Sequence, residues 1–199
     1  MKRVLITAFE PYDIWTANAS WLALIELTRE LPSNLAITTR LYPVNFDAVR
    51  ERLEEDLSEN FDVAIHLGQD PGSTAIKFET TAINMASEPD ASCDYRKLVP
   101  GGPSAFQSEL AVGQYASVLE AAGVPCSISH HAGTFLCNAV YYLSNFICTT
   151  HGWKTNSLFI HVPLDASQTA QMAYPLASMT SSLTASALRL VLNEIAIRD

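Results

Sequence analysis

The chain has 199 residues and a formal net charge of −9, and its 12 basic residues are scattered rather than clustered. A nucleic-acid partner would need a face of lysine and arginine side chains, so we expect no nucleic-acid binding. No apolar run approaches the roughly 20 residues of a membrane span, and the apolar stretch after Met1 is too short for a signal-peptide core. The sequence therefore predicts a cytoplasmic protein without membrane contact.

Strand-like and helix-like segments alternate in the N-terminal part of the chain. Ser20 is expected to cap the first helix, because serine is a good acceptor for the free N–H groups of a helix start. Apolar spacing predicts these segments: a strand at 4–9, a polar loop at 10–18, a helix at 21–31, a strand at 35–42, a helix at 46–57, and a short buried strand at 63–68 that ends in glycine.

The C-terminal part continues the alternation after one long loop. Residues 86–104 are polar and contain three prolines, and a loop of this length in a compact domain is usually functional or mobile. The other predicted segments are β structure at 76–84, a helix at 112–122, a strand at 126–129, an apolar helix at 134–150, a strand at 158–162 and an amphipathic helix at 179–197. Short buried strands separated by helices predict one α/β domain over residues 1–199, a three-layer α/β/α arrangement with a mostly parallel mixed sheet.

One of the four cysteines stands where a nucleophile would be favoured. Cys137 falls in the first turn of the helix predicted at 134–150, where free N–H groups and the helix dipole stabilise a thiolate. The thiolate is the attacking form of cysteine. A small buried core residue is the alternative, and position alone does not separate the two. No two cysteines form a CxxC pair, so a metal or redox pair has no support.

Two further residues have positions that suit catalysis. His161 ends a predicted buried strand just before a proline, at the edge of the sheet where α/β sites form, and its imidazole could accept a proton from the cysteine. Glu79 lies in strand-like sequence, where burial would require a partner such as an imidazolium. A core histidine and a solvent-facing edge glutamate are the alternatives.

These segments together resemble the pyroglutamyl-peptidase I (pyrrolidone-carboxylate peptidase) family of cysteine peptidases. AGTFLCN resembles the nucleophile segment of that family, FIHVP its histidine segment and FETTAIN its glutamate segment, in the same chain order. The resemblance implies Cys137 as nucleophile, His161 as base and Glu79 as the residue that orients it.

The resemblance also implies a substrate pocket and partners. The pocket would have aromatic walls, with the backbone at Gln69 and the side chain of Asn18 bonded to the lactam. The implied substrate-binding residues are Phe9, Tyr12, Asn18, Gln69, Phe135 and Leu136. Peptides with an N-terminal pyroglutamyl residue are the expected partners, together with other copies of the chain in a homo-oligomer, commonly a tetramer, held by the final helix and the loop at 86–104. Neither a cofactor nor a metal is implied.

The chain departs from the family pattern at four places. Ala8 stands where the family usually has glycine, and Asp13-Ile14 replaces a glycine-rich turn. Thr80 follows Glu79 where an arginine is usual, and Pro89 stands where another arginine is usual, with Arg96 the nearest arginine beyond it. Two other functions therefore stay open: a cysteine amidohydrolase of the same fold for another small cyclic amide, and a weakly active homologue that binds pyroglutamyl ends or serves as a structural subunit. The complete triad favours the peptidase.

Overall fold

A six-stranded sheet forms the centre of the computed structural model, which describes residues 1–88, 95–170 and 172–198. Its strands lie in the order β2-β1-β3-β8-β4-β7. They are β1 (Lys2–Phe9), β2 (Leu35–Tyr42), β3 (Val63–Gln69), β4 (Ile76–Glu79), β7 (Cys126–Ser129) and β8 (Asn156–Val162). The first four strands in that order are parallel, whereas β4 runs antiparallel to β8 and parallel to β7.

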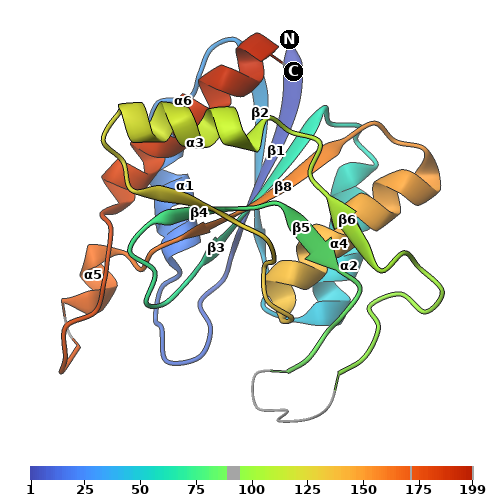
Figure 1. The fold of residues 1–199 in the computed structure, drawn as a ribbon, viewed down its shortest axis with the longest axis horizontal. Coiled ribbons are helices and arrows are strands. Elements are labelled where there is room, and N and C mark those ends of the chain that lie inside the picture. Colours follow the sequence, from blue (N-terminus) through green and yellow to red (C-terminus); the bar gives the residue numbers. More distant parts are fainter. Residues whose placement is uncertain (89–94, 171, 199) are drawn as a thin grey trace.

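Helices cover both faces of the sheet, as Figure 1 shows. They are α1 (Ala19–Thr28), α2 (Phe46–Leu57), α3 (Val112–Ala121), α4 (Leu136–His151), α5 (Ala166–Thr169) and α6 (Ser181–Arg198). Helices α1, α3 and α6 share one hydrophobic core, and α2 and α4 share the other. Alternate residues of β3 supply the two cores, because successive side chains of a strand point to opposite faces: Ile65 belongs to the first and Ala64 to the second. The predicted three-layer fold with a mostly parallel mixed sheet is confirmed.

The start of α1 differs from the prediction. Asn18, not Ser20, is the N-cap residue, and its Oδ1 accepts from the backbone N–H of Ser20 at 3.1 Å. The Ser20 hydroxyl lies inside the helix and is buried, where it accepts from the N–H of Phe9. Asparagine and serine are comparable N-caps, so the sequence alone did not choose between them. The helix also ends at Thr28, three residues before the predicted end.

The predicted β segment at 76–84 divides into two strands of different sheets. After β4, the chain enters β5 (Thr81–Ile83), which pairs with β6 (Ala105–Gln107) in a small antiparallel sheet that the sequence analysis missed. Buried Asn138 ties β5 to α4: its Oδ1 accepts from the N–H of Ile83, and its Nδ2 donates to the carbonyls of Ile83 and Met85. The short helix α5 was also missed, because four residues give no periodic signal.

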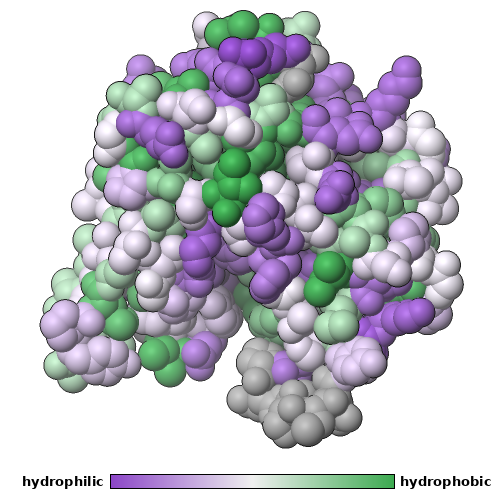
Figure 2. Space-filling view, in the orientation of Figure 1, coloured by the Kyte–Doolittle hydropathy of each residue, from purple (hydrophilic) through white to green (hydrophobic). Residues whose placement is uncertain are grey.

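Hydrophilic and hydrophobic side chains are interspersed over the face of the molecule in Figure 2. This distribution is consistent with the scattered charges of the sequence. No helix among the residues that the structure describes is long and apolar enough to cross a membrane.

A fully buried histidine lies in the central strand β3. The Nδ1 atom of His66 is hydrogen-bonded to the Thr7 hydroxyl at 2.8 Å, and its Nε2 has no partner among the described residues. Burial lowers the pKa of His66 from 6.5 to about 3, because the site offers no compensation for a charge. The folded protein therefore keeps this ring neutral at a pH where an unfolded chain would protonate it.

We expect His66 to make the protein acid-sensitive. The unfolded state binds a proton at this residue below pH 6.5 and the folded state does not, so stability is complete above pH 6.5 and falls as the pH drops toward 3. Between pH 7 and pH 5 this contribution to the loss of free energy of unfolding is about 2 kcal/mol. Urea unfolding at both pH values should show a smaller loss for His66→Asn, whereas a change at the exposed histidine, His130→Asn, should leave the loss unchanged. Equal losses in all three proteins would contradict the prediction.

Candidate active site

The start of α4 presents Cys137 at the carboxyl end of the parallel strands. Gly133 has a φ of 76°, Phe135 is extended and acts as the N-cap residue, and Cys137 is the second residue of the helix. The helix was expected to start near Thr134, but the backbone of Phe135 is extended and the helix begins at Leu136. The first intrahelical bond to the cap runs from the N–H of Ala139 to the carbonyl of Phe135 at 3.1 Å. The N–H groups before Ala139 therefore lie in the free first turn, beside the thiol.

Gly68 allows the cysteine to approach the sheet closely. A Cβ atom at this position would stand 2.7 Å from the ring of Phe159 and 3.1 Å from the Sγ of Cys137. The first separation is too short for a carbon atom and the second is tight, so a larger residue would displace the Phe159 ring and crowd the sulfur. The sequence analysis noted the glycine at the strand end but did not connect it with the cysteine.

His161 and Glu79 form a buried pair behind Cys137. The Nδ1 of His161 lies 2.7 Å from the Oε1 of Glu79, and the glutamate side chain is only 2% exposed. Glu79 stands opposite Phe159 in the antiparallel register of β4 and β8, two residues from His161 along β8. Such diagonal neighbours are within reach of long side chains. The three residues predicted as a triad are thus brought together from β4, α4 and β8.

The histidine is poised as a cation. Burial by itself lowers the pKa of His161, but the negative charge and hydrogen bond of Cys137, followed by those of Glu79, outweigh burial and raise it from 6.5 to about 10. The raised pKa favours the doubly protonated ring, which donates one N–H to the Glu79 carboxylate and is hydrogen-bonded to Cys137 through the other.

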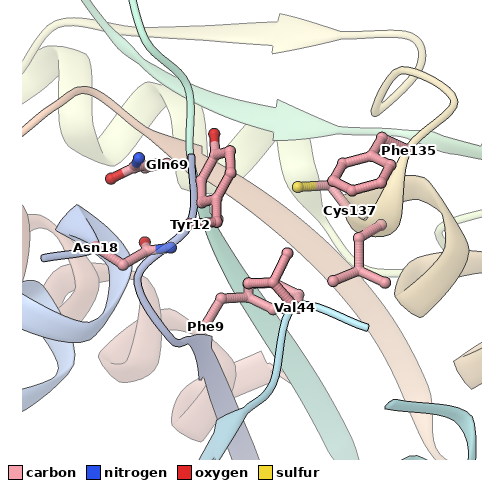
Figure 3. A pocket seen from close by; sticks show the side chains of 9 residues that line it. Phe9, Tyr12, Asn18, Val44, Gln69, Phe135 and Cys137 are labelled. Carbon is pink, nitrogen blue, oxygen red and sulfur yellow. The ribbon is translucent and has the colours of Figure 1, made fainter. Parts of the chain in front are cut away.

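A small cavity opens in front of the sulfur and encloses about 310 Å³, part of it open to solvent. Figure 3 shows Cys137 and Phe135 on one side of it, Gln69 and Asn18 on the other, and Tyr12 between them. None of the lining residues is an aspartate, glutamate, lysine or arginine; they are Phe9, Tyr12, Asn18, Val44, Gly68, Gln69, Phe135, Leu136 and Cys137. All six residues expected to bind substrate therefore lie around one cavity, and Val44 and Gly68 join them.

Two of these residues, Asn18 and Gln69, also make hydrogen bonds that hold neighbouring segments in place. Asn18 caps α1 and also donates from Nδ2 to the carbonyl of Glu10 at 3.1 Å. The Oε1 of Gln69 accepts from the N–H of Ala19 at 2.9 Å and from the Nε2 of Gln168 at 3.0 Å. Gln168, on α5, was missed because nothing local in the sequence connects it with this site.

Of Pro89, which replaces the family arginine, and Arg96, the nearest arginine beyond it, the structure describes only Arg96. Pro89 lies outside the described residues. Arg96 is exposed, and its guanidinium lies 5.1 Å from the centre of the Phe46 ring, which in turn packs edge-on against Phe135. Arg96 thus contacts Phe46, which packs behind Phe135 in the cavity wall. No cluster of three or more histidine, cysteine or acidic side chains that could hold a metal ion occurs among the residues described.

Comparison with known proteins agrees with this geometry. The family model described as pyroglutamyl peptidase matches residues 2–198. The chain belongs to the pyroglutamyl peptidase family.

Relatives and solved structures of this family resemble the chain over most of its length. The pyrrolidone-carboxylate peptidase of Pyrococcus furiosus is 36% identical over 167 residues, covering 81% of this chain and 80% of that protein. That of Bacillus subtilis is 31% identical over 191 residues, covering 92% and 88%. The crystal structure of the pyrrolidone carboxyl peptidase from Fervidobacterium islandicum AW-1 has a TM-score of 0.92 and 30% identity, and the match covers 98% of each chain.

The pKa of His161 gives a test that does not depend on turnover. Replacing Glu79 by glutamine removes one of the two anions that raise this pKa, so we expect the pKa to fall by about one to three units. The ring signals of His161 in a 15N-labelled sample, followed against pH by NMR, measure the change. Glu55→Gln, at an exposed glutamate of α2, is the matched control and should leave the titration in place. An unchanged His161 titration in Glu79→Gln would show that the pair does not act as described.

Proposed function

We propose that this protein is a cysteine peptidase that removes the N-terminal pyroglutamyl residue from peptides, and that residues 1–199 act as one catalytic domain. The observation that carries the proposal is a thiol beside a buried histidine–glutamate pair, at the mouth of a small uncharged cavity. A pyroglutamyl group is a flat, uncharged lactam. An ordinary N-terminus would bring an ammonium group, for which this cavity offers no carboxylate.

The chemistry follows the usual course of thiol acyl transfer. The Cys137 thiolate attacks the carbonyl carbon that joins the pyroglutamyl residue to the next one, and His161 donates its proton to the departing amine. The resulting thioester is attacked by water, whose proton returns to His161, and pyroglutamate leaves with the thiolate restored. Glu79 holds the ring and stabilises its charge in both steps. The free N–H groups of the first turn of α4 lie beside the sulfur, where they can bind the oxyanion.

We expect Cys137→Ala to lose at least about a thousandfold in kcat, since no other group replaces the nucleophile. Release of a fluorophore from a pyroglutamyl amide measures turnover, and the corresponding prolyl amide tests selectivity. Cys126→Ala, at a partly buried cysteine of β7, is the matched control and should stay within about twofold of the unchanged protein. Iodoacetamide should label Cys137 first. Activity that survives Cys137→Ala in a folded protein would overturn the assignment of the nucleophile. An unchanged protein that releases no fluorophore would return the function to the binding or structural alternatives.

We further propose a homo-oligomer, with a tetramer as the expected form, and a cytoplasmic location. Tyr95 in the 86–104 loop is 70% exposed and Leu183 on α6 is 40% exposed, so both predicted contact segments present apolar side chains to solvent. Burying such side chains between subunits would stabilise an assembly.

Light scattering coupled to size exclusion should give a mass about four times the 21.8 kDa of the chain. Charged substitutions at the two exposed positions, Tyr95→Asp and Leu183→Asp, should lower that mass, because an interface that buries an unpaired carboxylate is destabilised. A monomer at all working concentrations would contradict the proposal. A stable oligomer that neither substitution alters would place the interface elsewhere.

A further inference from the structure

An ion pair lies beside the candidate triad, outside the ring cavity. The Nζ of Lys77, on β4, donates to the Oδ2 of Asp70 at 2.6 Å, and Asp70 directly follows the end of β3. Strand β8 lies between β3 and β4 in the sheet. The lysine side chain therefore crosses β8 to reach its partner. The acyl-transfer steps described above use neither residue, so the pair has no role yet.

Lys77 is the cross-strand neighbour of His161. The two residues stand opposite each other in the antiparallel register of β4 and β8. Side chains of directly opposite residues lie on the same face of a sheet, with Cβ atoms about 4.5–5.5 Å apart. Phe78 belongs to the core on the side of α1, α3 and α6, so Lys77, the residue before it, points to the other face, where α4 carries Cys137. Lys77 thus stands next to the proposed base and on the same side of the sheet.

The order of the strands places Lys77 on the side of the leaving group. The ring cavity is lined by residues at the ends of β1 and β3 and by the start of α4. Next to β3 comes β8 with His161, and next to β8 comes β4 with Lys77. A substrate whose ring fills the cavity and whose scissile carbonyl meets Cys137 therefore extends its departing amine toward His161. The residue that carries this amine then lies toward Lys77.

The ion pair is accessible and has donors to spare. The side chain of Lys77 is 35% exposed and that of Asp70 is 29% exposed. An ammonium group has three N–H donors, and among the described residues Asp70 is the hydrogen-bond partner of the Lys77 Nζ. Burial is the main cause of the raised pKa of Tyr12, and the negative charges of Cys137 and Asp70 raise it further. Asp70 is therefore close enough to act on a residue of the cavity wall.

We propose that Lys77, held in place by Asp70, donates a hydrogen bond to the carbonyl oxygen of the residue that follows the pyroglutamyl group. This inference rests on the proposed function. In a longer peptide that oxygen belongs to a peptide group, and in a dipeptide it belongs to the terminal carboxylate, which accepts more strongly because it is charged. A simple anilide has no oxygen at this position. The site therefore favours peptidyl over anilide leaving groups, and Asp70 acts as a positioning residue.

Lys77→Met removes the ammonium group and keeps an apolar side chain of similar reach. Lys154→Met, at an exposed lysine just before β8, is its matched control. The substrates are pyroglutamyl-alanine, pyroglutamyl-alaninamide and pyroglutamyl 4-nitroanilide. We expect Lys77→Met to lower kcat/KM about 5- to 30-fold for the two alanyl substrates, with the larger loss for the free acid, and less than about threefold for the anilide. The control should match the unchanged protein on all three.

A purely structural role of the ion pair would give a different result. Loss of the Lys77–Asp70 contact would then disturb β4 and lower kcat/KM for all three substrates alike, and equal losses would overturn the proposal. Lys77→Arg keeps the charge and the donors, so it should restore most of the preference for the alanyl substrates. Thermal unfolding checks that each variant is folded, and Lys77→Gln takes the place of Lys77→Met if the latter is not.

Calorimetric binding to Cys137→Ala separates this inference from the peptidase proposal, because it requires no turnover. In that background Lys77→Met should weaken binding of pyroglutamyl-alanine about 5- to 30-fold and leave binding of 2-pyrrolidone unchanged. This difference in a protein that cleaves no substrate would contradict the peptidase and retain the Lys77 contact. Cleavage together with equal dipeptide binding would contradict the contact alone. If the protein neither cleaves nor binds the dipeptide, both proposals fail.

Discussion

The active site depends on a single electrostatic balance, the retention of a positive charge on a buried imidazole. A histidine in this position would be neutral if burial alone acted on it, because desolvation disfavours the charged form. Cys137 and Glu79 reverse that preference from opposite sides of the His161 ring. Removing either anion would leave a ring that is less able to hold a proton. The same two contacts that orient the imidazole thus also set its charge, which joins the geometry of the site to its chemistry.

The inverted direction of β4 is what brings the carboxylate into this arrangement. In the antiparallel register Glu79 is opposite Phe159, and its side chain reaches diagonally to His161. Phe159 contacts both His161 and the backbone at Gly68. Its ring centre lies 4.8 Å from that of His161, and the ring also occupies the space that a side chain at Gly68 would need. The ring of Phe159 thus packs against the imidazole, and the absence of a side chain at Gly68 leaves room for both that ring and the sulfur of Cys137.

The sequence predicted best where local pattern and final structure depend on the same residues. The strand at 35–42, the helix at 46–57 and the strand at 126–129 match their predicted ranges, because regular apolar spacing determines both. Boundaries were less accurate where two good signals compete, as with Asn18 and Ser20 at the start of α1. The positions proposed for catalysis were read from the resemblance of whole segments, since local arguments left core residues as alternatives for Cys137 and His161.

The contacts of Gln69 at the cavity could not be predicted in the same way, because they join segments that are distant in the sequence. Gln69 and Gln168 are 99 residues apart, and neither has a local pattern that announces the other. The two amides are held by a chain of hydrogen bonds. The N–H of Asp165 orients the amide of Gln168, and Gln168 together with the N–H of Ala19 orients the oxygen of Gln69. A carboxamide has one accepting and one donating end, so using all its accepting capacity outside the cavity commits the donating end to the inside. The orientation of the Gln69 amide is therefore fixed by residues that do not themselves line the cavity.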